Sequence, residues 1–267
     1  EDLFWNAPYT FDDYYLTNRI NGGVRINGAF LNRNIDVIIS NNHYRRIKNT
    51  YRKNLVSLEE DLRADGDQDT TKSSSWINRV TCANIKKQKI NYQYGYEVFQ
   101  EQINTQRILG NSKTRKEFSF FSSIQLETFK NIFLKPGIRI SYNNDYKVPL
   151  IPSINMKYNL KTHIFRFSYG QGFRSPSLKE MFFNFIDSNH EIVGNPDLKP
   201  ETSKNFQFNW TKNITQKNKI GLDFFYNDIN NLITLVEVEN SINQSINYSY
   251  ENIGNYETIG AKINYKI

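Results

Sequence analysis

The sequence predicts an all-β protein made of antiparallel strands, and three observations support that prediction. Apolar and polar residues alternate along nearly the whole chain of 267 residues, at the period of two that is typical of strands. Aromatic residues make up 15% of the chain, although hydrophobic residues reach only 38%. Short and long connections also alternate along the chain between these segments. We therefore expect a sheet with one apolar face and one polar, wet face.

The first strands are expected at residues 24–30 and 34–40, and three more lie between residues 90 and 142. Every second side chain in them is apolar, and the opposite face carries mainly Asn, Ser, Gln and Gly. The apolar positions are Val24, Ile26 and Phe30; Ile35, Val37 and Ile39; Ile90, Tyr92, Tyr94, Tyr96 and Val98; Phe118, Phe120, Ile124 and Leu126; and Ile132, Leu134, Ile138, Ile140 and Tyr142.

The later strands repeat the same pattern. Their clearest apolar positions are Phe165, Phe167 and Tyr169, followed by Phe206, Phe208 and Trp210. Further strands are expected at residues 219–226, 241–250 and 258–267. The total is roughly a dozen strands, most of about 8–12 residues, which is the length that a tilted strand needs to cross a membrane.

The connections between strands fall into two classes. Tight connections are expected at residues 128–131, 159–161 and 212–218, and long ones at residues 49–75, 104–113, 173–202 and 227–240. Short turns on one rim and long loops on the other are typical of bacterial outer-membrane barrels. The pattern alone leaves two architectures open, because a soluble sandwich or small barrel would point the apolar face inward. Long strands, abundant aromatics and a polar face poor in Lys and Glu favour the membrane barrel.

Composition narrows the function classes. One cysteine, Cys82, allows no internal disulfide and no cysteine cage for zinc. The net charge is +7, but Lys and Arg are scattered, whereas nucleic-acid binders cluster them, so we expect no nucleic-acid partner. No apolar run approaches the ~20 residues of a spanning helix. No secretory signal is visible at the N-terminus, and the strand pattern favours the interior of a longer chain over a cytoplasmic protein.

One acidic segment invites a metal-site hypothesis. Asp65, Asp67 and Asp69 have the spacing that opens an EF-hand calcium loop. The match then fails, since Thr70 stands where the sharp turn needs Gly and Trp76 where the bidentate Glu belongs. We expect a solvated acidic loop and no metal site.

The three histidines are far apart in the sequence, and none forms a ligand-like pair. We expect His163 to be structural at a strand start, and His43 to end a strand at a solvated rim. His190 lies in the longest loop, where an imidazole could ligate haem iron or stand free in solvent. No nucleophile–base pair or paired carboxylates are visible, so we expect no enzyme activity and no resident cofactor.

Two sequence blocks flank that longest loop. Residues 168–182 read SYGQGFRSPSLKEMF, and residues 194–203 read GNPDLKPETS. They resemble the pattern of TonB-dependent outer-membrane receptors, in which an aromatic strand ends in GFRAPSLKEL and a later block reads GNPxLKPE. Residues 224–233 and 250–265 resemble the next two blocks of that family, in the right order. With the preceding strands, the resemblance covers at least residues 134–267.

The resemblance implies a transmembrane β-barrel of about 22 strands, occluded by a plug domain and driven by the TonB complex of the inner membrane. Such a receptor lies in the bacterial outer membrane, contacts its lipid and imports a scarce nutrient: an iron–siderophore complex, haem or a cobalamin-like molecule. The resemblance assigns residues 1–267 to part of the barrel domain. Roughly a dozen strands cannot close such a barrel, and no plug or TonB box is visible, so we expect an internal piece of a receptor.

Haem receptors of this family carry a histidine between an FRAP-type and an NPNL-type box. The first box is matched by Phe173, Arg174 and Pro176, with Ser175 in place of the usual Ala. The second follows Gly194 and is matched by Asn195, Pro196 and Leu198, with Asp197 in place of Asn. Only His190, between the boxes, suggests haem. We expect the box residues to fix the shape of the loop, with Arg174 and Glu201 holding its geometry.

The first functional hypothesis is therefore energised nutrient import, with lumen-facing Arg139 and Arg166 and the loop around His190 bordering a ligand cavity. The alternative is a passive porin-like or adhesin barrel without energy coupling. A third hypothesis is a soluble carbohydrate-binding β protein.

Overall fold

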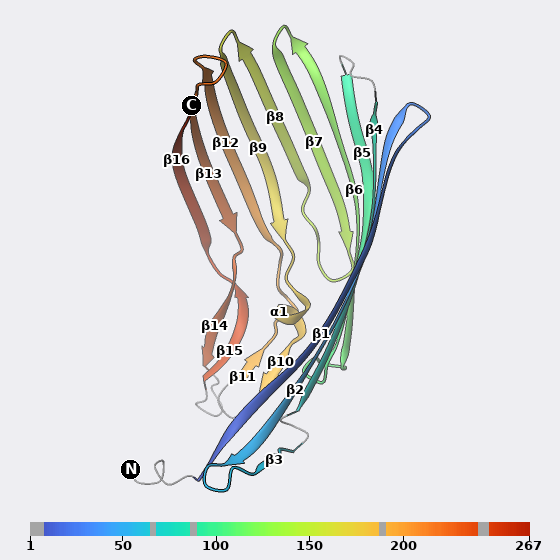
Figure 1. Ribbon diagram of the computed structural model, residues 1–267, viewed down its shortest axis with the longest axis vertical. Helices are drawn as coiled ribbons and strands as arrows, with labels where there is room; N and C mark the ends of the chain where they lie inside the picture. The colour runs from blue at the N-terminus through green and yellow to red at the C-terminus, as the bar shows by residue number, and fades with distance from the viewer. Residues whose placement is uncertain (1–7, 65–67, 86–89, 187–190, 240–245) are drawn as a thin grey trace.

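The computed structural model describes residues 8–64, 68–85, 90–186, 191–239 and 246–267. Most of the chain forms one antiparallel sheet of 12 strands in the order β1-β2-β4-β5-β6-β7-β8-β9-β12-β13-β16, with β3 paired to β2 (Figure 1). Their bounds are β1 Tyr9–Phe30, β2 Arg33–Asn54, β3 Glu60–Leu62, β4 Asp69–Asn84, β5 Ile90–Asn104, β6 Ser112–Phe129, β7 Ile132–Asn143, β8 Ile151–Leu160, β9 His163–Arg174, β12 Glu201–Asn213, β13 Lys219–Asn230 and β16 Asn255–Lys266.

The large sheet is an open wall. Within the described residues β1 pairs only with β2 and β16 only with β13, so the two edge strands do not meet. The all-β antiparallel fold and the count of about a dozen strands are confirmed. Neighbouring strands place aromatic residues side by side on the same face of the sheet, for example Phe208 of β12 opposite Phe224 of β13.

The two faces of the wall differ in character. The apolar face is open: Ile263 is 73% exposed and Tyr142 71%. The opposite face is polar and cross-linked, for example by Arg139 with Glu97 and by Asn264 with Asp223. Burying apolar surface is worth about 25 cal/mol per Å², and soluble monomers rarely expose large apolar patches. The apolar face therefore requires a non-aqueous environment, and the polar face lines the lumen.

The two rims differ as the sequence predicts. The β1–β2, β6–β7 and β8–β9 turns are tight and share one rim (Figure 1). Leu31 and Asn32 turn the β1–β2 hairpin with φ angles of 46° and 60°, the left-handed pair that a two-residue hairpin turn requires. Asn131 and Lys161 have φ angles of 70° and 50° in the next turns. The long connections lie on the opposite rim.

The N-terminal strands are longer than expected. β1 and β2 have 22 residues each, β6 has 18 and β4 has 16, so the connection expected at residues 49–75 is shorter than predicted. At about 3.3 Å per residue, β1 spans about 70 Å, well beyond the hydrocarbon layer. Polar residues extend the hairpin there, and cross-strand ion pairs such as Lys48 Nζ to Asp13 Oδ2, 3.1 Å, support it. Apolar alternation therefore underestimates the strand length.

A second, smaller sheet is built from the long connections. It has the order β10-β11-β15-β14, with bounds β10 Asn184–Ile186, β11 Glu191–Val193, β14 Ile233–Glu239 and β15 Ile246–Asn252. A five-residue helix, α1 Leu178–Phe182, precedes it. The segments expected as irregular loops at residues 173–202 and 227–240 are thus partly ordered. No helix in the described residues has both the length and the apolar character needed to cross a membrane.

Candidate functional site

The candidate site is the ordered structure on the rim of long connections. We call it the loop assembly and define it as the β7–β8 connection, residues 175–200 and residues 231–254, as far as they are described. It contains α1 and the small sheet, which lie beyond the ends of β9 and β12 (Figure 1). Helix α1 also contacts β6, so the segment after β9 reaches across the polar face of the wall.

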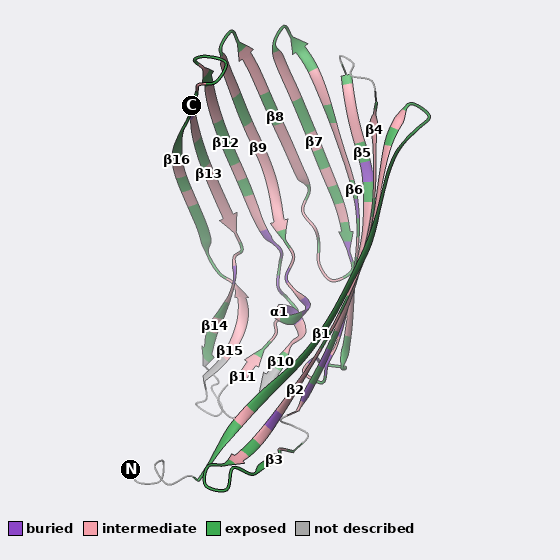
Figure 2. Ribbon diagram, in the orientation of Figure 1, coloured by how far each residue is buried: buried purple, intermediate pink, exposed green. Residues whose placement is uncertain are grey.

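The apolar core of the described chain lies in this loop assembly and at its contact with the wall. One cluster joins Ile103, Ile108 and Leu178, and a second joins Met181, Leu198 and Ile233. Each of these side chains is at most 9% exposed. Figure 2 shows buried residues at α1 and near the adjoining strand ends. The loop assembly is therefore packed like the interior of a soluble domain.

Helix α1 is held at its N-terminus by a capping box. The Ser177 hydroxyl accepts the Glu180 N–H at 3.1 Å, and Glu180 Oε2 accepts the Ser177 N–H at 2.6 Å. These bonds satisfy two backbone donors that the first turn leaves free. Buried Pro176 precedes the cap, and its carbonyl accepts a hydrogen bond from Arg115 of β6. The first box thus starts the helix and ties it to the wall.

Arg174, at the end of β9, joins both ends of the long connection. Its guanidinium is 3.1 Å from Glu180 Oε1 and 2.7 Å from Glu201 Oε1. Glu201 Oε1 also accepts the Ile233 N–H at 2.9 Å. The hydrogen bond from Arg174 lowers the pKa of Glu201 below its usual range, against the opposing effect of burial. One guanidinium therefore links β9, α1 and β12, and its carboxylate partner reaches β14.

The second box binds the small sheet. Asn195 donates to the Tyr250 carbonyl at 3.0 Å and accepts the Asp197 N–H at 2.9 Å. Gly194 passes so close to the backbone of Phe182 and Phe183 that an added Cβ would lie 2.7 Å from their nitrogens. A side chain at this position would therefore force the two segments apart.

The other box residues differ in how far they are buried. Leu198 is buried in the second apolar cluster. Pro196 and Asp197 are exposed, and Phe173 is half-buried at the end of β9. Their proposed role in fixing the shape of the loop stays a prediction.

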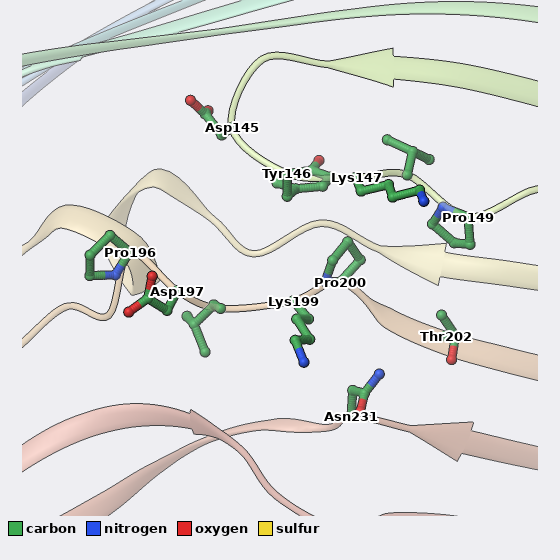
Figure 3. Close-up of a pocket in the computed structure, with 12 residues that line it drawn as sticks. Asp145, Tyr146, Lys147, Pro149, Pro196, Asp197, Lys199, Pro200, Thr202 and Asn231 are labelled. Carbon is green, nitrogen blue, oxygen red and sulfur yellow. The ribbon is translucent and has the colours of Figure 1, made fainter.

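A cavity of 590 Å³ opens between the β7–β8 connection and the second box (Figure 3). Its walls combine prolines, two lysines, two aspartates and one phenol; they include Asp145, Tyr146, Lys147, Pro149, Pro196, Asp197, Lys199 and Pro200. Figure 3 shows Tyr146 and Lys147 on the strand-connecting segment that faces Pro196 and Lys199. The two lysines are matched in number by the two aspartates, so the lining combines flat apolar surfaces with charges of both signs.

The sequence reasoning missed the β7–β8 connection as part of this site. Asn143 donates to the Tyr146 hydroxyl at 3.0 Å, and that hydroxyl donates to Ser175 of the first box. Burial raises the pKa of the Tyr146 phenol and that of the Asp145 carboxyl. Asp145 Oδ2 is buried and has no hydrogen-bond partner among the described residues. The polar run of residues 143–147 between two strands is the signal that could have pointed here.

The two arginines predicted to border a ligand cavity lie on the polar face, as expected from their alternation, but not together. Arg139 of β7 donates to Glu97 Oε1 at 2.6 Å and to Ser119 Oγ at 2.8 Å. Arg166 of β9 donates to Asn209 Oδ1 at 3.0 Å and lines a separate 320 Å³ cavity with Lys135 and Lys157. Their role in ligand binding stays a prediction.

His190 lies outside the described residues, so its proposed ligand role stays a prediction. His163 begins β9, where its ring stacks on Trp210 and its Nδ1 accepts the Trp210 Nε1–H at 3.0 Å. His43 is exposed but lies inside β2, so the expectation that it ends a strand was wrong. The strand continues because residues 43–54 pair with β1 in unbroken register.

The expected solvated acidic loop was wrong for Asp69, the one of the three aspartates within the described residues. Its side chain is only 1% exposed and lies 3.5 Å from Arg46 Nη2 and 3.6 Å from Arg107 Nε. Thr105 also donates to it at 3.0 Å. It begins β4, where these cations compensate the buried carboxylate.

An open antiparallel wall with one polar face, tight turns on one rim and packed loops on the other defines an outer-membrane type of β-barrel. The chain belongs to the family of TonB dependent receptor-like β-barrels, whose pattern it matches over residues 1–266. This assignment confirms the resemblance seen in the sequence.

Two curated relatives come from Haemophilus influenzae. The heme/hemopexin utilization protein C is 23% identical over 273 residues, which covers 83% of this chain and 38% of that protein. The hemoglobin and hemoglobin-haptoglobin-binding protein C is 42% identical over 72 residues, 26% of this chain and 6% of that protein. The chain thus spans well under half the length of these relatives.

Solved structures show the same fold. The siderophore receptor PirA from Pseudomonas aeruginosa matches with a TM-score of 0.68 at 15% identity, over 97% of this chain and 57% of that one. A mutant of the ferric enterobactin receptor from the same organism matches with a TM-score of 0.70 at 16% identity, over 93% of this chain and 41% of that one. At this identity the likeness concerns the fold alone.

Proposed function

We propose that this chain is part of the barrel domain of an outer-membrane receptor that imports an iron-containing nutrient, with haem as the favoured ligand. The observation that carries the proposal is the family match over residues 1–266 together with a packed loop assembly over the polar face. None of the relatives described above is named as a porin or an adhesin, so the passive alternative is not proposed.

The haem assignment is supported by the curated relatives, which are named for haem, hemopexin and haemoglobin. It is also supported by the position of His190 between the two boxes, since a neutral imidazole is a good ligand for haem iron. The ordered boxes on either side anchor the two ends of that segment through Arg174 and Asn195.

Energy coupling completes the proposal. A plug domain, carried elsewhere in the receptor, would fill the lumen against polar residues such as Arg139 and Arg166 and engage the TonB complex. The ligand would be captured by the loop assembly and released inward when the plug rearranges. No catalytic step is required of this chain.

Haem titration of the full-length receptor tests the ligand assignment. We expect His190→Ala to weaken haem binding at least about tenfold, a loss of about 1.4 kcal/mol, and to change the Soret absorption of the bound haem. His43→Ala is the matched control, because His43 is exposed on β2 outside the loop assembly, and it should bind like the wild type. Unchanged affinity and spectrum in His190→Ala would refute haem ligation by this residue.

Energy coupling is tested separately by growth. Cells that depend on the receptor for iron should grow on haem only when the TonB complex is intact. Equal growth without that complex would contradict active import and would support a passive barrel.

A further inference from the structure

The outer, apolar face of the wall ends in a cationic patch on strands β2, β4 and β6. Moving toward the loop rim, the continuous apolar run on these strands ends at Ile39, Trp76 and Phe118, and Ile47 lies further out on the same face of β2. Side chains an even number of residues further on lie on the same face. These positions hold His43 and Arg45 on β2, Lys72 on β4 and Lys116 on β6. We call these four residues the outer basic patch.

The register brings the two central cations together. Arg45 is the direct partner of Lys72 in the β2–β4 pairing, which places their Cα atoms about 5 Å apart. Lys72 is in turn paired with Asn104 of β5. A cavity of 440 Å³ lies here, lined by residues of β1, β2, β4 and β5 that include His43, Arg45 and Lys72. Three residues of the patch, His43, Arg45 and Lys72, therefore line an open hollow.

These cations have no anionic partner in the described part of the chain. Arg45, Lys72 and Lys116 are exposed, and none forms an ion pair with a described carboxylate. The contrast with the next residue is direct: Arg46, on the opposite face of β2, pairs with Asp69 at 3.5 Å. Arg46 on the inner face is thus neutralised by a carboxylate, whereas no ion pair joins Arg45, Lys72 or Lys116 to a described carboxylate.

The patch is local to one side of the wall. At the corresponding end of the far strands, Lys204 of β12 is paired in register with Asp228 of β13, which is paired with Glu257 of β16. That part of the outer face is therefore mixed in charge, and a positive charge at the lipid boundary is not a general feature of the strand ends.

We infer that the outer basic patch binds the phosphate of an anionic lipid headgroup in the membrane leaflet around the loop-side rim. Arg45 and Lys72 would hold the phosphate, and the apolar band below, ending in Trp76 and Phe118, would contact the acyl chains. Arg donates in a planar fork that suits phosphate oxygens, and Lys adds a point charge. This inference rests on the membrane placement in the proposed function, but it does not depend on which nutrient is imported.

The test is binding of diphosphorylated lipid A, and of the same lipid without phosphates, to the detergent-solubilised full-length receptor. One cation near an anionic lipid surface is worth about 1 kcal/mol, which is about a fivefold change in affinity. We expect Arg45→Gln and Lys72→Gln each to weaken binding of the phosphorylated lipid about fivefold, and the double variant about 25-fold. The dephosphorylated lipid should bind the wild type about as weakly as the phosphorylated lipid binds the double variant.

Lys204→Gln is the matched control and should leave the affinity unchanged. Arg45→Lys keeps the charge and should retain most of the binding, which separates a charge effect from misfolding. Wild-type affinity in the double variant would overturn the inference. Inorganic phosphate that binds as tightly as the lipid would also overturn it, because the site would then recognise the free ion. Haem binding measured on the same samples separates a failure of this inference from a failure of the proposed function.

Discussion

The loop assembly and the wall both contain many apolar side chains, but they place them in different surroundings. In the loop assembly, Met181 and Leu198 are 2% and 3% exposed and contact other apolar residues of the same chain. In the wall, Ile259 and Ile263 are 85% and 73% exposed, and nothing in the described chain covers their face. The first region is stabilised by its own core, and the second depends on lipid.

This difference indicates that the loop assembly and the wall are stabilised in different ways. The loop assembly is joined to the wall by the hydrogen bond from Arg115 to Pro176, by the ion pair of Arg174 with Glu180 and by the apolar cluster that contains Ile103 and Leu178. The wall should tolerate a charged substitution on its polar face, where water is present, but not on its lipid face. Substitutions matched between the two regions should therefore have different effects.

The largest effect is expected from Leu198→Ala. Truncating a buried leucine costs about 2–5 kcal/mol because a cavity remains, so the loop assembly should open and residues 175–200 should become sensitive to protease. Ile263→Ala, on the exposed face of β16, is the control and should leave both regions resistant. Equal protease resistance of the two variants would show that the loop assembly has no independent core.

The next effect distinguishes the two faces of a single strand. Phe208→Arg places a charge on the lipid face of β12 and should destabilise the receptor in lipid vesicles by about 2–4 kcal/mol near the bilayer midplane. Gln207→Arg places the same charge on the polar face and should change the stability little. Urea unfolding in vesicles measures both, and a reversed order would mean that the faces are assigned the wrong way round.

A smaller effect is expected from Arg174→Gln. The change leaves the carboxylate of Glu201, which is only 8% exposed, without its cation, at a cost of about 1–2 kcal/mol. Hydrogen exchange should rise in α1 and in β14, whose Ile233 N–H is bound by Glu201. Arg25→Gln, which removes an exposed pair with Asp36 on the wall, is the control and should leave exchange in the loop assembly unchanged.

The smallest effect is a pH dependence of the loop assembly. The pKa of Glu201 is lowered by Arg174, so its contribution to stability is fully present above the unfolded pKa of about 4.3 and is lost as the pH falls through the folded value. The protection factors of the β14 amides, which are corrected for intrinsic exchange at each pH, should therefore fall below about pH 4.3. Burial raises the pKa of Asp145, which acts in the opposite direction, so the measurement belongs in an Asp145→Asn background. Glu201→Gln should abolish the remaining dependence.

The sequence predicted the wall well because alternation reports directly on two faces with different surroundings. Phe206, Phe208 and Trp210 share one face of β12 as expected. Strand ends were predicted less well, since β1 and β2 continue beyond the alternating band as a hairpin held by backbone pairing and by cross-strand side-chain contacts such as Lys48 with Asp13. The alternation of apolar and polar residues does not predict such extensions.

The candidate site could be predicted only in part. The boxes marked the right segment, but the contact of Tyr146 with Ser175 joins residues 29 positions apart and depends on how the loops fold over the wall. The same holds for Asp69, whose acidic neighbours suggested solvent and whose cations, Arg46 and Arg107, come from distant segments. Local sequence does not reveal such long-range pairing.

The most direct test of the two-region account is the accessibility of spin labels along β12. Single cysteines at positions 205–210 of the full-length receptor, in a Cys82→Ser background, would carry a nitroxide in lipid vesicles. We expect labels at Phe206, Phe208 and Trp210 to collide with oxygen dissolved in the lipid, and labels at Asn205, Gln207 and Asn209 to collide with a water-soluble nickel chelate. Equal access of the nickel chelate to all six positions would contradict a lipid-facing wall around a polar lumen.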